Sequence, residues 1–148
     1  MELIPEFTMR AFLGEVFDIG ATPVGMRTVV DVTGGGVKGA RLTGELVGPS
    51  GDWLTVGSDG FGRLDVRTQI RTEDGALIYG HYDGVLELAG VQTTMAEGLE
   101  GSFDDAYFRT TPHLETADER YGWVNHTVFV ARGRTLPGAV EYEVFRVT

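Results

Sequence analysis

The sequence contains no cysteine among its 148 residues. A disulfide framework, a thiolate zinc site and a cysteine nucleophile are therefore excluded, and the fold has to be stabilised by packing. A chain of this length buries roughly two thirds of the surface that it exposes when unfolded, which is enough for a hydrophobic core without cross-links. We expect a single β-barrel domain spanning residues 1–148.

Basic residues are also scarce. Twelve lysines and arginines stand against 22 acidic residues, so the formal net charge is −10. This charge repels phosphate backbones and anionic lipid head groups, and we expect neither nucleic acid nor a membrane as a partner. The sequence has no run of 18 apolar residues, and its N-terminal MELIPEF has no basic segment followed by an apolar one. The expected location is therefore cytoplasmic.

What the sequence does contain is alternation, clearest between residues 52 and 78. Asp59-Gly60 and Asp74-Gly75 separate short runs rich in Val, Ile, Leu and Thr, as in strands that reverse through tight turns. Between the two turns, a period of two places charged and polar residues on one face and apolar residues on the other. The charged face holds Arg63, Asp65, Arg67, Gln69 and Arg71. We expect this face on the outside, the alternative being that part of it lines a polar cavity.

The same signals recur along the chain and predict about eight or nine antiparallel strands. Residues 91–101 are the one segment that suits a short helix. We predict an all-β fold, a single and mostly up-and-down antiparallel barrel, because glycines inside long strands suit a curling sheet better than the alternative two-sheet sandwich. A barrel of about eight strands has room for side chains or one small ligand. Residues 122–131 are apolar on both parities, which indicates a strand covered on both sides and a homodimer.

Two motif interpretations find little support. Residues 34–39 match the dinucleotide-binding pattern G-x-G-x-x-G, which needs a helix directly after it. Gly44 and Pro49 argue against such a helix, and a glycine-rich turn explains residues 34–39. His81, His113 and His126 lack metal-ligand spacing. A metal site would have to combine them with carboxylates from other strands, which the sequence cannot reveal. We predict neither a metal nor another cofactor.

Several separated segments resemble a bacterial and fungal family known as domain of unknown function 3237. The resemblance rests on residues 36–46, 64–78 and 107–131, on Asp52-Trp53 and on Asp59-Gly60, in this order. It implies a compact antiparallel β-barrel of soluble proteins that often associate in pairs. It implies no established activity, so it supplies no catalytic residues.

The residues themselves suggest a binding site for a small organic ligand. In this hypothesis Arg67 and Arg109 hold an anionic or carbonyl oxygen, Tyr107 and Trp123 form apolar walls, and Asn125 adds a polar contact. The competing interpretation is structural, since arginines on a strand are commonly solvated and Trp and Tyr are commonly core residues.

Two carboxylates are the predicted catalytic residues, Asp52 and Glu115. A carboxylate in a partly apolar pocket has a raised pKa and can exchange a proton near neutral pH. The leading hypothesis is therefore a cofactor-independent isomerase, cyclase or lyase acting on an aromatic or polyketide-like substrate. The alternatives are a non-catalytic carrier or sensor of the same ligand and a purely structural homo-oligomer.

Overall fold

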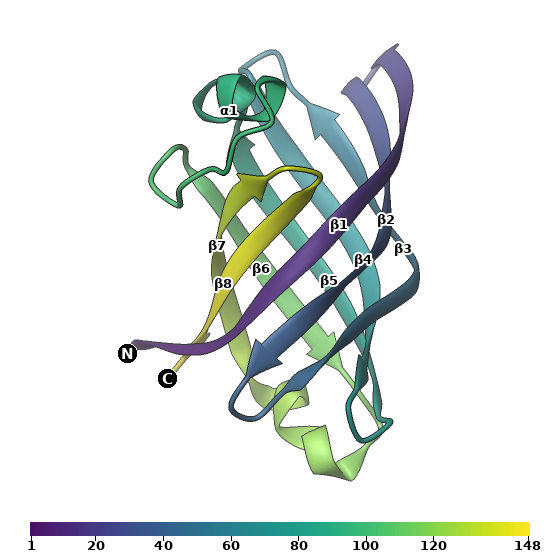
Figure 1. Cartoon of the computed structure of the whole chain (residues 1–148), viewed down its shortest axis with the longest axis vertical. Helices are drawn as coiled ribbons and strands as arrows, with labels where there is room; N and C mark the ends of the chain where they lie inside the picture. Colours follow the sequence, from purple (N-terminus) through teal and green to yellow (C-terminus); the bar gives the residue numbers. More distant parts are fainter.

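The computed structural model describes residues 1–148 and shows a closed antiparallel barrel (Figure 1). Its eight strands follow one another in chain order, and β8 pairs with β1 to close the ring. This confirms the predicted all-β, up-and-down barrel. The strands are β1 (Leu3–Thr22), β2 (Gly25–Gly39), β3 (Thr43–Val56), β4 (Phe61–Thr72), β5 (Leu77–Glu87), β6 (Phe108–Glu115), β7 (Val128–Leu136) and β8 (Ala139–Val147).

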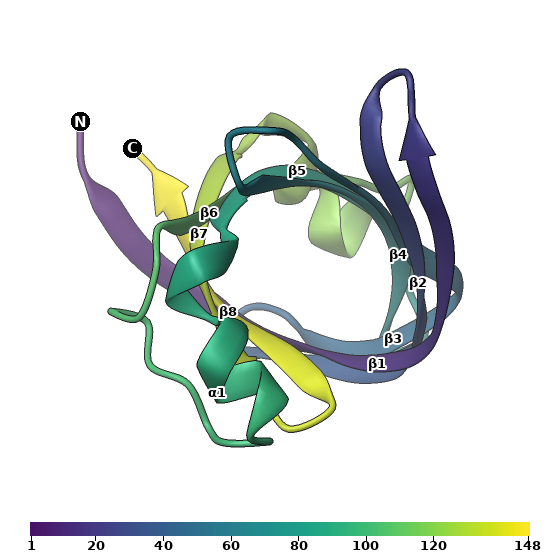
Figure 2. The ribbon, with the colours of Figure 1, turned by 90° about the horizontal axis from the view of Figure 1, so that it is seen from above.

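Three short helical segments lie at the two ends of the barrel. The 3₁₀ turn η1 (Leu88–Gly90) and helix α1 (Gln92–Ala96) follow β5, and α1 lies beside the rim when the barrel is seen from above (Figure 2). The 3₁₀ segment η2 (Glu119–His126) lies at the opposite end, below β6 and β7 (Figure 1). We call these the α1 end and the η2 end. None of these helical segments is long and apolar enough to cross a membrane.

The alternation in β4 decides which face of the sheet points inward. Leu64, Val66 and Ile70 are at most 7% exposed, whereas Arg63 and Arg67 lie on the outer surface. The charged face is therefore the solvated one, as the pattern favoured. The apolar face of β4 points inward because the apolar side chains of all the strands can contact one another only inside the barrel.

The strand predicted at residues 122–131 is wrong over its first half. Its first residues belong to η2, which begins after Asp118. The carboxylate of Asp118 caps this segment by accepting a hydrogen bond from the backbone N–H of Arg120. Val124 is 1% exposed, and the Trp123 ring meets the Phe129 ring at a centroid distance of 6.3 Å. Residues 122–131 are apolar on both parities because a helical plug precedes a strand, and not because a sheet is covered twice. The homodimer stays a prediction.

The glycine-rich segment at residues 34–39 lies within β2 and is not followed by a helix. Gly35 has a φ of +140°, and a Cβ built on it would lie 2.0 Å from the carbonyl oxygen of Arg10 on β1. A side chain there would force β1 and β2 apart. The glycines thus serve close strand packing, and the dinucleotide interpretation has no structural basis.

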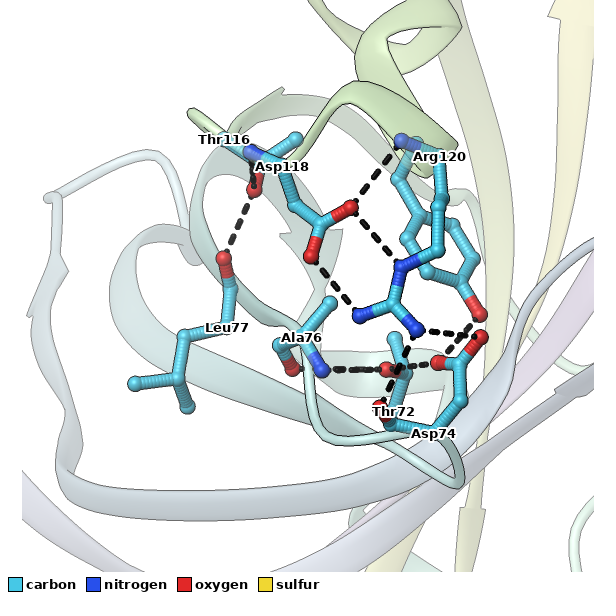
Figure 3. Close-up of polar contacts among 8 residues, drawn as sticks. Thr72, Asp74, Ala76, Leu77, Thr116, Asp118 and Arg120 are labelled. Carbon is cyan, nitrogen blue, oxygen red and sulfur yellow. Dashed lines mark hydrogen bonds and ion pairs between the residues drawn. The ribbon is translucent and has the colours of Figure 1, made fainter.

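A polar cluster fastens η2 to the turn between β4 and β5 (Figure 3). Asp74 accepts hydrogen bonds from the hydroxyls of Thr72 and Tyr121, at 2.6 and 2.7 Å, and Arg120 Nη1 lies 3.2 Å from its Oδ2. These donors lower the pKa of Asp74, with Thr72 as the largest cause. The Asp-Gly turn predicted from the sequence therefore also anchors the plug at the η2 end.

Candidate functional site

The half of the barrel near the α1 end contains a cavity of about 120 Å³. Its walls are largely aliphatic and include Leu64, Val66 and Leu86, whose side chains point inward from β4 and β5. Met95 of α1 contributes to the lining although it is 52% exposed, so the cavity lies next to the rim. A small apolar space with a route to solvent is the form that ligand sites in barrels commonly take.

Asp52 is the one charged residue in this lining. It sits on β3 between Val30 of β2 and Val66 of β4, and its Oδ1 accepts a hydrogen bond of 3.0 Å from the backbone N–H of Asp65. Burial among hydrocarbon raises the pKa of Asp52 from 3.8 to about 6, and this effect outweighs the single backbone donor. Asp52 can therefore hold or release a proton close to neutral pH.

Two tyrosines share the cavity with Asp52. Tyr82 of β5 and Tyr142 of β8 meet across the interior with ring centroids 5.1 Å apart, in an edge-to-face arrangement. Burial raises the pKa of both phenols well above the ordinary value, and the negative charge of Asp52 adds to the increase. Both hydroxyls therefore stay protonated at neutral pH and can donate hydrogen bonds.

The sequence analysis missed these tyrosines, although a signal for one of them was present. Tyr82 shares its parity on β5 with Ile78, Gly80 and Leu86, all of which face inward. Continuing the alternation of β4 through the Asp-Gly turn would have placed Tyr82 inside. No pattern in the sequence indicates that Tyr142 lies opposite it.

The other predicted site residues lie away from this cavity. Arg67 projects outward from β4 and donates a hydrogen bond of 3.1 Å to the Tyr79 hydroxyl. Tyr107 and Arg109 line a broad groove on the outside of β5 to β8, where the Arg109 guanidinium lies 5.1 Å from the centre of the Tyr107 ring. They cannot reach a ligand held beside Asp52, because the barrel wall separates the two sites.

Glu115, Trp123 and Asn125 lie toward the η2 end. Glu115 is exposed at the end of β6, and it shares a shallow outer pocket with Asn125. The Asn125 side chain is already engaged, since it both accepts from and donates to the backbone of Thr116. Trp123 packs in the plug. The structure therefore brings Asp52 into an interior site and leaves the second predicted carboxylate outside it, and the ligand-binding roles of the outer residues stay predictions.

The cavity offers a single carboxylate and no imidazole, so its lining does not form a metal site. An imidazole and two carboxylates do come together on the outer face of β4 and β5, at His81, Asp65 and Asp83. These residues do not belong to the interior site.

Comparison with known proteins identifies the family. Residues 1–147 match the profile of a family described as protein of unknown function DUF3237. The chain belongs to the DUF3237 family. It is 31% identical over 144 residues to a UPF0311 protein of Bradyrhizobium diazoefficiens, a match that covers 95% of this chain and 93% of the relative.

Two solved structures show how widely the DUF3237 fold extends. A β-barrel-like protein from Acinetobacter baumannii superposes with a TM-score of 0.84 and 30% identity, covering 99% of this chain and 96% of its own. An enzyme from Penicillium herquei superposes with a TM-score of 0.73 and 20% identity, covering 99% of this chain and 94% of its own. At that identity, the second likeness establishes the shared barrel alone.

Proposed function

We propose that this DUF3237 protein binds a small, partly aromatic organic molecule inside the α1 half of its barrel and exchanges a proton with it through Asp52. The observation that carries the proposal is a single carboxylate, with its pKa raised to about 6, in a largely apolar cavity that it shares with two phenols. A carboxylate buried for packing alone would be a net cost, because hydrocarbon of the same size fills such a space more favourably. Its position in the cavity fits a chemical role.

In this proposal, the two tyrosines donate the hydrogen bonds that stabilise the negative charge formed when Asp52 removes a proton. When a base removes a proton next to a carbonyl, negative charge develops on the carbonyl oxygen, and donors already in place stabilise that charge. Tyr82 and Tyr142 keep their protons at neutral pH and face the same cavity as Asp52. The set therefore suits enolisation, and with it the isomerase, cyclase or lyase reactions that proceed through an enol and use no cofactor.

Cavity size limits the ligand that fits. An apolar cavity of roughly 150 Å³ accepts benzene, so one of about 120 Å³ encloses only part of a ring-bearing ligand, and the rest of the ligand lies at the open rim. Leu54, Leu88 and Met95 border the cavity where it approaches the rim. A larger polyketide-like molecule would place its reacting end beside Asp52 and extend the rest toward the α1 end.

The Penicillium herquei protein supports an enzymatic role, since it is an enzyme built on the same barrel. A carrier that only binds the ligand would need the cavity but not an ionisable group within it. The raised pKa of Asp52 therefore favours the enzyme over the carrier.

Acetophenone is a suitable probe, because it combines one aromatic ring with a ketone whose methyl protons exchange through an enol. The protein is incubated with acetophenone in deuterated buffer at pH 7, and loss of the methyl signal is followed by proton NMR. We expect wild-type protein to accelerate deuteration and Asp52→Asn to abolish that acceleration. The matched control is Asp104→Asn, which removes a carboxylate from an exposed loop and should change nothing.

Methyl chemical shifts report whether and where the probe binds. Shifts at Leu64 and Val66 on binding, together with exchange that depends on Asp52, would support the proposal. Shifts without exchange would favour the carrier. A probe that perturbs only residues on the outside of the barrel would overturn the interior site.

A further inference from the structure

On the outer face of the barrel, two carboxylates and an imidazole converge from two adjacent strands. Asp65 of β4 and Asp83 of β5 are direct cross-strand partners, and His81 lies two residues from Asp83 on the same face. The His81 Nε2 atom lies 3.1 Å from Asp65 Oδ1 and 3.5 Å from Asp83 Oδ1. One ligand atom from each residue lies within 4.8 Å of the others.

These separations match those around a bound transition metal. Zinc bonds of about 2.0–2.1 Å to nitrogen and oxygen, at tetrahedral angles, separate neighbouring ligand atoms by roughly 3.3 Å. The two distances from His81 Nε2 bracket that value. Two of the three ligand separations therefore already suit one ion, the third is within 4.8 Å, and water would complete the coordination.

The two carboxylates face each other across the β4–β5 ladder without a closely paired arginine. Like charges directly opposite each other on paired strands are unfavourable. Elsewhere on the barrel an arginine relieves such charge at close range, as Arg132 does for Glu143 at 2.7 Å. At this site the nearest arginine, Arg67, approaches Asp65 only to 3.9 Å, and Asp83 has no arginine partner.

The surrounding sheet holds the three side chains in a fixed arrangement. The β4–β5 ladder runs through eleven consecutive residue pairs without a bulge. The next strand places His113 directly opposite His81, with ring centroids 6.4 Å apart. Ligands on regular strands are positioned more precisely than ligands on loops.

We propose that Asp65, His81 and Asp83 form a surface site for zinc or a neighbouring divalent transition ion. An imidazole ligand selects such ions over calcium and magnesium, which prefer oxygen ligands alone. The three ligand side chains lie on the outer face of β4 and β5, and binding of an ion there does not require the proposed function of the cavity.

Isothermal titration of the full chain with zinc chloride at pH 7.5 tests the site. We expect one equivalent to bind, and both His81→Gln and Asp83→Asn to weaken binding on the order of tenfold or more, since losing even an outer-shell partner has such an effect. The matched control is His126→Gln, which removes an exposed imidazole in η2 and should leave binding unchanged. Calcium chloride in excess should not compete.

A gain-of-affinity variant sharpens the test. Arg67→Gln removes the positive charge nearest to Asp65 and should tighten zinc binding, because that charge repels the incoming ion. The absence of zinc binding by wild-type protein would overturn the proposal. So would equal affinities of wild type, His81→Gln and Asp83→Asn, with far-UV circular dichroism showing that each variant retains the barrel.

Discussion

The two halves of this barrel are built from the same eight strands but are filled differently. The half near the η2 end is solid, with Ile70, Ile78, Val124, Phe129 and Val144 each at most 1% exposed. The half near the α1 end contains a cavity and a half-buried carboxylate. The strands therefore form the same frame at both ends, and the side chains inside it provide stability in one half and a candidate site in the other.

The ends of the barrel differ in the same way. At the η2 end, Arg120 and Tyr121 tie the plug to the β4–β5 turn through Asp74 (Figure 3). At the α1 end, α1 is only five residues long, has no capping side chain and buries none of its own residues. One end is held shut by charge-assisted contacts, and the other is only lightly covered, as entry of a ligand requires.

The largest expected effect comes from truncating the solid half. Phe129→Ala should lower the free energy of unfolding by about 3–5 kcal/mol, because the fully buried ring packs against Phe7 and Trp123. Leu54→Ala at the cavity should cost only about 1–2 kcal/mol, because that side chain already lacks contacts on one side. Urea unfolding measures both values, and equal losses would show that the two halves are packed alike.

A smaller effect is expected from Asp52, and it depends on pH. The folded chain raises the pKa of this carboxyl from 3.8 to about 6, so the folded state binds the proton more tightly than the unfolded state does. Stability is therefore lost as the pH rises from about 4 through 6, by at most roughly 3 kcal/mol. Asp52→Asn removes this loss.

Thermal or urea unfolding of wild type and Asp52→Asn across this range measures the difference. The variant should gain stability over wild type progressively between pH 4 and pH 6 and hold its advantage above pH 6, with no advantage below pH 4. Asp104→Asn should follow the wild-type curve throughout. Parallel stability curves for Asp52→Asn and wild type would mean that the cavity does not raise the pKa of the Asp52 carboxyl.

Enlarging a buried alanine should change the free energy of unfolding differently in the two halves, by a smaller amount than the truncations do. Ala11 lines the cavity, and Ala131 is buried elsewhere in the core. Ala131→Leu should destabilise the protein by about 1–3 kcal/mol, whereas Ala11→Leu should be close to neutral because it grows into empty space. Ala11→Leu should also abolish acetophenone binding observed by NMR. Comparable destabilisation by both substitutions would contradict the cavity.

The smallest effect on stability is expected at the rim. Met95→Ala changes a half-exposed residue on α1 and should alter the free energy of unfolding by less than about 0.5 kcal/mol. It should nevertheless speed the release of acetophenone, because Met95 forms part of the cavity lining at the α1 end. NMR exchange rates measure the release, and Leu99→Ala, on the exposed loop after α1, serves as the control.

Much of the fold could be predicted because it depends on local patterns. The alternation of Leu64, Val66 and Ile70 with charged residues, and the Asp-Gly turns on either side, predict the strands and their connections and favour the apolar face as the inward one. The prediction failed at η2, where apolar residues on both parities looked like a doubly covered strand. A helical turn that inserts a plug into a barrel produces the same composition, and periodicity over so few residues cannot separate the two.

The candidate site was predictable only in part. Asp52 could be selected as a carboxylate within an apolar segment, but its meeting with Tyr82 and Tyr142 depends on how far the strands shift as the ring closes. The same holds outside the barrel, where Asp65, His81 and Asp83 are brought together by the β4–β5 register.

The residue pattern was sufficient to predict antiparallel strands joined by tight turns, and it favoured a barrel with the charged face of β4 outside. Which residues become neighbours across the interior depends on the closed barrel, and so does the finding that Asp52 and not Glu115 shares a cavity with two phenols. A period of two assigns each side chain to a face of its strand, whereas curvature, tilt and register determine which side chains that face contacts.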